Sequence, residues 1–242
     1  MEDSRFRFKS FEVSHHRSSM KVGVDAVLLG AWAGINPKKI LDVGTGCGVI
    51  SLMLSQRFPE ATVDAIDIDE NSIEEARENF DRSLWNNRLR VCLANFAEFS
   101  CHFRDNCRQY DLIVSNPPYF DSGIENPVTS REKARHQSSL SVFSLLEKSK
   151  DLMAESGRLS MIFPAEFYEK VRKVSERERY VLLRECRIRN RPEREEKRVM
   201  MEFGKRDFYE DVKFETKHLV MFEGGEPTEE YRRLCKDFYL KF

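Results

Sequence analysis

Three glycines alternate with other residues in the segment Asp42-Val-Gly-Thr-Gly-Cys-Gly48, which directly follows an apolar run. Glycine lets a backbone turn sharply and approach a ligand closely, and a helix that starts after such a turn offers free N–H groups to an anion. Dinucleotide sites normally use a longer spacing, G-x-G-x-x-G. Asp42 precedes the first glycine, where its carboxylate would face a positive group such as the ammonium of S-adenosylmethionine. The segment therefore predicts a cofactor cradle built on Asp42, Gly44, Gly46 and Gly48.

The next two apolar runs end in residues that would complete this cradle. The first ends at Asp67, whose carboxylate can accept hydrogen bonds from both ribose hydroxyls, and Ile68 would lie against the same ligand. The second leads to Asn95 and Phe96, where an amide could bind the amino group of an adenine and the ring could pack on the base. A plainer interpretation is that Asp67 and Asp69 cap the next helix and that Asn95 only turns a loop. We favour the binding role for both positions.

A fourth apolar run, Tyr110 to Ser115, ends in Asn116-Pro117-Pro118-Tyr119. The prolines fix an extended backbone and remove two N–H donors, so acceptors remain. The Asn116 side-chain oxygen and the Pro117 carbonyl can both accept from one NH2 group, while Tyr119 offers a flat face to a planar base or amide. These contacts would aim the lone pair of an exocyclic amine at a methyl donor, so that positioning and electrostatics carry the reaction. A proline-rich turn with a packed tyrosine is the plainer alternative.

Alternating strands and helices must position these motifs. The pattern predicts strands at 39–43, 61–68, 89–93, 110–115 and 158–163, and helices at 25–32, 49–57, 71–80 and 141–153, with Asp25 as the N-cap of the first helix. A charged helix at 166–178 and strands at 186–191, 199–203 and 219–222 follow. This order indicates a Rossmann-like α/β three-layer sandwich with a mostly parallel seven-stranded sheet and an antiparallel finish.

Length and composition limit the class of protein. The chain has 242 residues, of which 40% are apolar and 11% aromatic, so a disordered tail, a collagen-like fibre and a small disulfide scaffold are excluded. Without a linker or repeat we predict one domain over 1–242, with an arm and a cofactor-covering helix at 1–36 and a catalytic core at 37–242. We see no secretory signal and no apolar stretch long enough for a bilayer. Six cysteines without a C-x-x-C pair indicate no metal site and a cytoplasmic protein, which we expect to be a monomer.

Charge is segregated along the chain. The net charge of −1 argues against binding nucleic acid by bulk charge, but residues 168–206 hold 14 basic and eight acidic residues, so this stretch is +6 and the rest is −7. Within it Arg187, Arg189 and Arg191 alternate along a predicted strand, a spacing suited to phosphates. The plainer interpretation is a solvated edge strand. Further RNA-binding candidates follow the Asn-Pro-Pro-Tyr motif, namely Arg131, Lys133, Arg135 and His136.

The glycine loop and Asn116-Pro-Pro-Tyr119 together resemble the class I S-adenosylmethionine-dependent amino-group methyltransferases. The segments His15 to Trp32, Ala134 to Gln137 and Tyr231 to Tyr239 resemble, more specifically, the bacterial tRNA1(Val) adenine-N6 methyltransferases, and this resemblance covers nearly the whole chain. It implies a class I methyltransferase fold and methylation of N6 on a flipped adenine just after the anticodon. It also implies that Lys21 to Asp25 folds over the methionine end of the cofactor, so that Lys21 contacts it. Asn95 departs from the family, which often has Asp there.

Other functions share parts of this pattern. Glutamine methyltransferases that act on release factors, and DNA adenine enzymes, share the Asn-Pro-Pro-Tyr motif, but they resemble proteins with an additional substrate domain. Guanine-N2 enzymes more often have Phe where this chain has Tyr119. A non-catalytic RNA-binding module on the same fold and a nucleotide-dependent dehydrogenase are candidates from other classes. The intact Asp42 loop and Asn116 disfavour the former, and the glycine spacing disfavours the latter.

Overall fold

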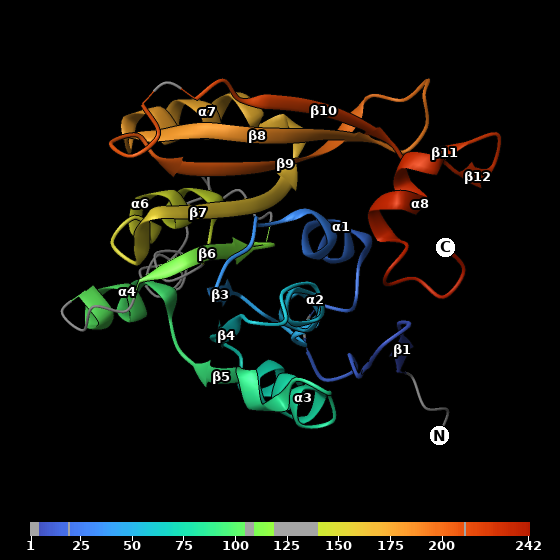
Figure 1. Cartoon of the computed structure of the whole chain (residues 1–242), viewed down its shortest axis with the longest axis horizontal. Helices are drawn as coiled ribbons and strands as arrows, with labels where there is room; N and C mark the ends of the chain where they lie inside the picture. The colour runs from blue at the N-terminus through green and yellow to red at the C-terminus, as the bar shows by residue number, and fades with distance from the viewer. Residues whose placement is uncertain (1–4, 19, 105–108, 119–139, 211) are drawn as a thin grey trace, which may run out of the picture.

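A computed structural model describes residues 5–18, 20–104, 109–118, 140–210 and 212–242 (Figure 1). The strands are β1 (Phe6–Arg7), β2 (Glu12–Val13), β3 (Lys39–Val43), β4 (Thr62–Asp67), β5 (Leu89–Leu93), β6 (Tyr110–Ser115), β7 (Met153–Pro164), β8 (Tyr180–Arg189), β9 (Glu196–Lys205), β10 (Glu215–Val220), β11 (Phe222–Glu223) and β12 (Glu226–Pro227). The helices are α1 (Val24–Trp32), α2 (Val49–Arg57), α3 (Glu70–Asp81), α4 (Phe96–Arg104), α6 (Val142–Ser149), α7 (Tyr168–Arg177) and α8 (Glu229–Cys235), with 3-10 turns at Asn86–Arg88 and Ala165–Phe167.

One eight-stranded sheet forms the centre of the molecule, in the order β10-β8-β9-β7-β6-β3-β4-β5. Every neighbouring pair is parallel except the two pairs made by β9, which runs antiparallel to β7 and β8. Buried residues form two clusters, one with α1, α2, α3 and α8 and the other with α4, α6 and α7, so helices cover both faces. The three-layer α/β architecture is confirmed.

The sheet has eight strands and not the predicted seven, and the strand predicted at 219–222 lies at 215–220. Residues 215–220 form β10, which pairs in parallel with β8 and adds an eighth strand at the edge of the sheet. β8 and β9 are also longer than predicted, because charged residues at 184, 185 and 202 sit within them and broke the apolar pattern. β8 ends at Arg189, so Arg191 lies beyond the strand on which three arginines were expected to align.

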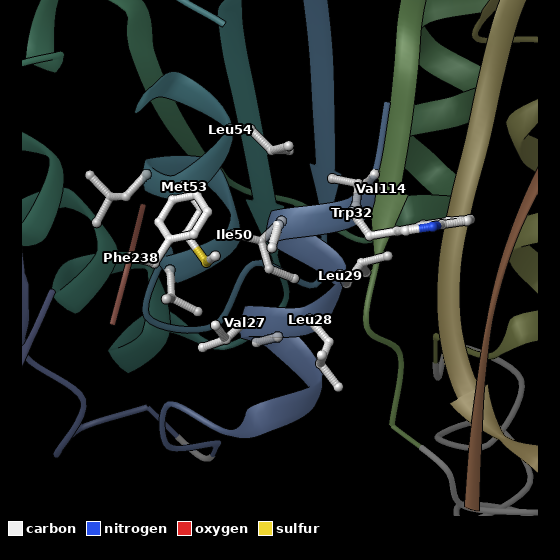
Figure 2. Close-up of a cluster of buried hydrophobic side chains, with 14 of the residues drawn as sticks. Val27, Leu28, Leu29, Trp32, Ile50, Met53, Leu54, Val114 and Phe238 are labelled. Carbon is white, nitrogen blue, oxygen red and sulfur yellow. The ribbon is translucent and has the colours of Figure 1, made fainter. Parts of the chain in front are cut away.

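Helix α1 is buried along most of its length between α2, β6 and the C-terminal segment. Figure 2 shows Val27, Leu28, Leu29 and Trp32 of α1 beside Ile50, Met53 and Leu54 of α2, with Val114 and Phe238 in the same cluster. The predicted N-cap was wrong, because α1 starts at Val24 with Gly23 as N-cap and no side chain caps it. Asp25 lies in the first turn, where its carboxylate pairs with Arg198 of β9. A tertiary partner thus replaces the local cap.

The end of α1 is fastened to the antiparallel part of the sheet by a buried carboxylate, that of Glu202 on β9. It accepts hydrogen bonds from Arg158 (2.7 Å), from two atoms of Arg184 (2.9 Å each), from Ser160 (2.7 Å) and from the backbone N–H of Gly34 (3.0 Å). Arg184 also donates to the carbonyl of Trp32 at 2.9 Å and stacks on its ring. Burial alone would raise the pKa of Glu202, but these donors outweigh it and lower the pKa to about 2.

The segment before α1 is fastened by a second buried carboxylate, that of Glu75 on α3. It accepts hydrogen bonds from the backbone N–H groups of His16 (2.8 Å), Arg17 (3.0 Å) and Ser18 (2.9 Å), which outweigh the effect of burial and lower its pKa. One turn later, the Asn79 side chain donates to the carbonyls of Ser14 and Cys47, both at 2.8 Å. Helix α3 therefore holds the N-terminal arm against the glycine loop.

Candidate active site

A cavity of about 770 Å³ lies where four parallel strands end. Val43 ends β3 and Gly44 follows it, and Asp67 ends β4 and Ile68 follows it. Asn95 follows β5, Asn116 follows β6, and all six residues line the cavity. This volume is typical of a site for a cofactor or small ligand. The cavity brings together, from the predicted site, Lys21, Gly44, Gly46, Asp67, Ile68, Asn95, Phe96 and Asn116. The predicted residues Asp42, Gly48, Pro117, Arg187 and Arg189 do not line it.

The glycine loop has the backbone geometry that glycine allows. Gly44, Gly46 and Gly48 have φ values of 71°, 55° and 84°, which disfavour residues with a side chain. A Cβ at Gly48 would lie 2.5 Å from the ring of Phe80, so α3 packs directly against the loop. A Cβ at Gly46 would meet no described atom within 4 Å, because this residue faces the cavity. Gly48 therefore serves packing, and Gly46 leaves room for a ligand.

Asp42 is completely buried beneath this loop. Its Oδ2 accepts hydrogen bonds from the hydroxyls of Thr45 (2.7 Å) and Ser51 (2.6 Å), and its Oδ1 has no hydrogen-bond partner among the described residues. Burial raises the pKa of Asp42 to about 6, although the two hydroxyls oppose that effect. An acid left half satisfied in this way fits a site that is completed by a positively charged group.

Asp67 and Asp69 have different roles. The Asp67 carboxylate accepts hydrogen bonds from the backbone N–H groups of Gly46 (2.8 Å) and Asp69 (3.0 Å), so it ties the glycine loop to the end of β4 while lining the cavity. Asp69 is the N-cap of α3 and accepts from the backbone N–H and the hydroxyl of Ser72. The capping interpretation is therefore confirmed for Asp69, and the ribose contact of Asp67 stays a prediction.

Asn95 turns the chain into α4. Its side-chain oxygen accepts a hydrogen bond from the backbone N–H of Ala97 at 2.8 Å, as the loop interpretation predicted. The residue nevertheless lines the cavity, as do Phe96 and Ile68, and Ile68, which follows β4, is 59% exposed. These three residues form a largely apolar wall at the β4–β5 end, which suits a planar base. The contact of Asn95 with a base stays a prediction.

Asn116 is half-buried, Pro117 is buried and Pro118 is exposed at the end of β6. The hydroxyl of Ser115 donates to the carbonyl of Val43 at 2.7 Å, so the residue before Asn116 is bonded to the residue before Gly44. The two motifs are thereby held at a fixed separation on neighbouring strands. Tyr119, Arg131, Lys133, Arg135 and His136 lie outside the described residues, so their predicted roles stay predictions.

The cavity also has polar and charged walls, of which the sequence indicated only Asp25, in the segment expected to cover the cofactor. Asp25 of α1, Arg198 of β9, and Ser144, Glu147 and Lys148 of α6 line it. Asp25 and Arg198 form an ion pair between α1 and β9. Arg198 was one of 14 basic residues in its segment, and its spacing to Asp25 follows no local period, so only the tertiary fold identifies it.

Arg187 and Arg189 at the end of β8 are engaged in ion pairs. Arg187 lies 3.0 Å from Glu185 and 3.7 Å from Glu196, and it stacks on the ring of Tyr168. Arg189 lies 3.2 Å from Glu196. The positive charge of this face is partly compensated, which the count of arginines alone did not indicate. The phosphate-binding role of these two arginines stays a prediction.

The described residues contain no group of three or more His, Cys, Asp or Glu side chains that could hold a metal ion. None of the helices in the described ranges is long and apolar enough to cross a membrane.

A sheet with one antiparallel strand near its edge, a glycine cradle after β3 and an Asn-Pro-Pro turn after β6 define a class I methyltransferase. Residues 24–172 match the family model described as "Methyltransferase small domain". The structure is similar to that of a predicted O-methyltransferase of Agrobacterium tumefaciens, with a TM-score of 0.68 and 18% sequence identity over 88% of this chain and 96% of the other.

Relatives of similar sequence identify the family within the class I methyltransferases. The chain is 40% identical to the tRNA1(Val) (adenine(37)-N6)-methyltransferase of Parabacteroides distasonis and 37% identical to that of Trichodesmium erythraeum. Both matches cover 100% of this chain and 100% of the relative. The chain belongs to the tRNA1(Val) (adenine(37)-N6)-methyltransferase family.

Proposed function

We propose that the protein transfers a methyl group from S-adenosylmethionine to N6 of adenine 37 in a valine tRNA. The observation that carries the proposal is the position of Asn116, which lines the same cavity as the glycine loop and is coupled to it through the bond between Ser115 and Val43. Full-length relatives named for this reaction identify the base and the tRNA. We place the reaction in the cytoplasm and expect a monomer built as one domain.

The residues present fit S-adenosylmethionine. The Oδ1 of Asp42, which has no partner among the described residues, suits the positive charge of the cofactor's ammonium. The open space beside Gly46 lets the cofactor lie close to the backbone of the loop, and the Asp67 carboxylate suits the ribose hydroxyls. Lys21 would cover the methionine end, and Ile68, Asn95 and Phe96 would hold the adenine end. The bound cofactor supplies an electrophilic methyl group.

The protein's own part in the reaction is to hold an amine in place. The Asn116 side-chain oxygen and the Pro117 carbonyl accept hydrogen bonds from the two hydrogens of the adenine N6, and Tyr119 supports the ring from one side. The amino nitrogen is a weak nucleophile because its lone pair is delocalised into the ring, and the two acceptors turn that lone pair toward the methyl group. The nitrogen becomes acidic once it is methylated, so no strong general base is required.

Contact with the RNA would come from two basic regions. We propose that Arg131, Lys133, Arg135 and His136, which follow the catalytic turn, bind phosphates near the flipped base. Arg187 and Arg189 would bind phosphates farther out, where their acidic partners Glu185 and Glu196 limit the net attraction.

The test is methyl transfer from labelled cofactor to unmodified tRNA, followed by digestion and nucleoside mass spectrometry. We expect N6-methyladenosine with the wild-type protein and a loss of roughly 100-fold or more in rate with Asn116→Ala, because an acceptor aimed at the reacting group is removed. The proposal fails if no N6-methyladenosine forms, and its mechanism fails if Asn116→Ala keeps full activity. Cofactor binding by calorimetry separates an inactive enzyme from a module that never bound the cofactor.

A further inference from the structure

The ion pair between Asp25 and Arg198 is a charged feature of the cavity wall that neither the glycine loop nor Asn116 uses. Both residues line the cavity, and their side chains are only 15% and 28% exposed. Arg198 sits on β9 opposite Pro164, the last residue of β7, and therefore lies at the edge of the sheet where Asn116 follows β6. A guanidinium is thus fixed inside the catalytic cavity.

The pairing with Asp25 holds this guanidinium in place without using all of it. The contact involves Nε of Arg198, and neither of its NH2 groups has a partner among the described residues. Arginine presents five N–H donors in a planar fork that matches the oxygens of a phosphate or carboxylate. Burying the charge is tolerable because Asp25 compensates it. The remaining donors are available to an oxyanion that enters the cavity.

The position of Arg198 favours the substrate side of the cavity. The order of strands at the edge is β9, β7, β6 and β3, so Arg198 lies two strands beyond Asn116 and on the side away from the glycine loop. Two strand spacings are about 10 Å. That distance is comparable to the reach of one nucleotide from the edge of its base to its phosphate. The glycine loop, which follows β3, is one strand farther from Arg198 than Asn116 is.

The surface outside Arg198 also suits a nucleic acid backbone. Arg191 and Arg194 are exposed in the turn between β8 and β9, at the same edge of the sheet, and form no ion pair with any other described residue. A chain of phosphates leaving the cavity past β9 would meet these two arginines. A cofactor carboxylate, by contrast, would need no positive charge beyond the cavity.

We propose that Arg198, oriented by Asp25, binds the phosphate of the nucleotide whose base is methylated. This assignment rests on the proposed function in that the substrate is an RNA nucleotide. Arg198 is then a substrate-binding residue, and Asp25 is a positioning residue that keeps the guanidinium in a single orientation.

The experiment compares Arg198→Gln with Lys197→Gln in equilibrium binding of unmodified valine tRNA and in steady-state kinetics. Lys197 is the neighbouring residue on β9, carries the same charge, is exposed and does not line the cavity, so it is a matched control. For Arg198→Gln we expect tRNA affinity to fall about 10-fold, KM for tRNA to rise by a similar factor with kcat little changed, and the salt dependence of binding to weaken by about one phosphate contact. Lys197→Gln should stay within about 2-fold of wild type.

Three further measurements show whether Arg198 binds an RNA phosphate or the cofactor carboxylate, and whether the variants are folded. The double variant Asp25→Asn/Arg198→Gln leaves no unpaired acid, so it should keep the wild-type melting temperature and still bind tRNA weakly. Arg198→Lys keeps the charge without the fork and should lie between wild type and Arg198→Gln. Calorimetry compares S-adenosylmethionine with methylthioadenosine, which lacks the amino-acid end, and Arg198→Gln should bind both as the wild type does.

The proposal is overturned if tRNA affinity is unchanged in Arg198→Gln. It is also overturned if that variant loses affinity for S-adenosylmethionine but not for methylthioadenosine, because Arg198 would then hold the cofactor carboxylate. A wild-type protein that binds tRNA without methylating it would contradict the proposed function. The comparison of tRNA binding by the wild type and Arg198→Gln would still decide the role of Arg198.

Discussion

Two buried carboxylates in neighbouring parts of the sheet differ in how many hydrogen-bond donors surround them, and their pKa values shift in opposite directions. Glu202, on the antiparallel strand β9, accepts hydrogen bonds from two guanidinium groups, a hydroxyl and a backbone N–H, and its pKa is lowered to about 2. Asp42, on the parallel strand β3, accepts from two hydroxyls, has one unpartnered oxygen, and its pKa is raised to about 6. A buried acid with all its donors holds a structure together, whereas one that lacks donors fits a site for a ligand.

The largest effect should follow from removing the charge of Glu202. In Glu202→Gln, Arg158 and Arg184 remain around a neutral group, so we expect a loss of about 3–5 kcal/mol in the free energy of unfolding. Urea denaturation measures this loss. Glu223→Gln, at an exposed position on β11, should change stability by no more than about 0.5 kcal/mol. If the two variants unfold at the same urea concentration, Glu202 does not hold this region.

The pH dependence of stability should have the opposite sign for Asp42. Its pKa is about 6 when folded and near its usual 3.8 when unfolded, so its contribution is fully present below about pH 4 and is lost as the pH rises through 6. The cofactor-free wild type should therefore lose up to about 3 kcal/mol relative to Asp42→Asn between pH 4 and pH 7. The Glu202 contribution is instead lost as the pH falls from 4.5 toward 2. A constant difference between wild type and Asp42→Asn would contradict the raised pKa.

The same Asp42→Asn variant should bind the cofactor poorly. Loss of a charge-assisted contact to the ammonium is expected to weaken S-adenosylmethionine binding by about 10–100-fold, while the asparagine oxygen still accepts from Thr45 and Ser51. Isothermal titration calorimetry provides the measurement, with Asp81→Asn at the exposed end of α3 as control. Unchanged affinity in Asp42→Asn would mean that the raised pKa has no connection with the ligand.

Substitution of Glu75 should have a smaller effect. Like Glu202, its buried carboxylate accepts several hydrogen bonds, but it holds the N-terminal arm, whose residues Met20 and Lys21 line the cavity. Glu75→Gln should loosen the amides of residues 16–18 and weaken cofactor binding about 3–10-fold, with kcat near wild type. Hydrogen exchange of these amides and the cofactor KM report the change. Asp81→Asn, exposed at the end of the same helix, is the control, and equal exchange in both variants would exclude the anchor.

The sequence predicted the parallel part of the molecule better than the antiparallel part. Around Gly44, Asp67 and Asn116, apolar strands end in chemically distinctive residues, so local patterns identified both the elements and the edge where they meet. β8 and β9 contain Glu185, Arg184 and Glu202, whose charges pair only in the tertiary fold, and their bounds were therefore predicted too short.

Tertiary pairing also explains what the site prediction missed. Asp25 has the residue type and position of an N-cap, but its partner is Arg198 on a distant strand. Asn95 and Asp69 have the local roles that their residue types favour, and both also line the cavity, which only the fold reveals. Local signals identified the Asp69 cap and the Asn95 turn but gave a wrong cap at Asp25, because a charge paired across the sheet is identified only by the fold.

The proposed reaction in this cavity is the methylation of one adenine of a tRNA. The most direct measurement uses two unmodified valine tRNA transcripts that differ only in having adenine or guanine at position 37, the position named for the relatives. Each is incubated with labelled S-adenosylmethionine and analysed by nucleoside mass spectrometry. We predict N6-methyladenosine in the adenine transcript and none in the guanine transcript. Equal methylation of both transcripts, or of neither, would contradict the proposed function.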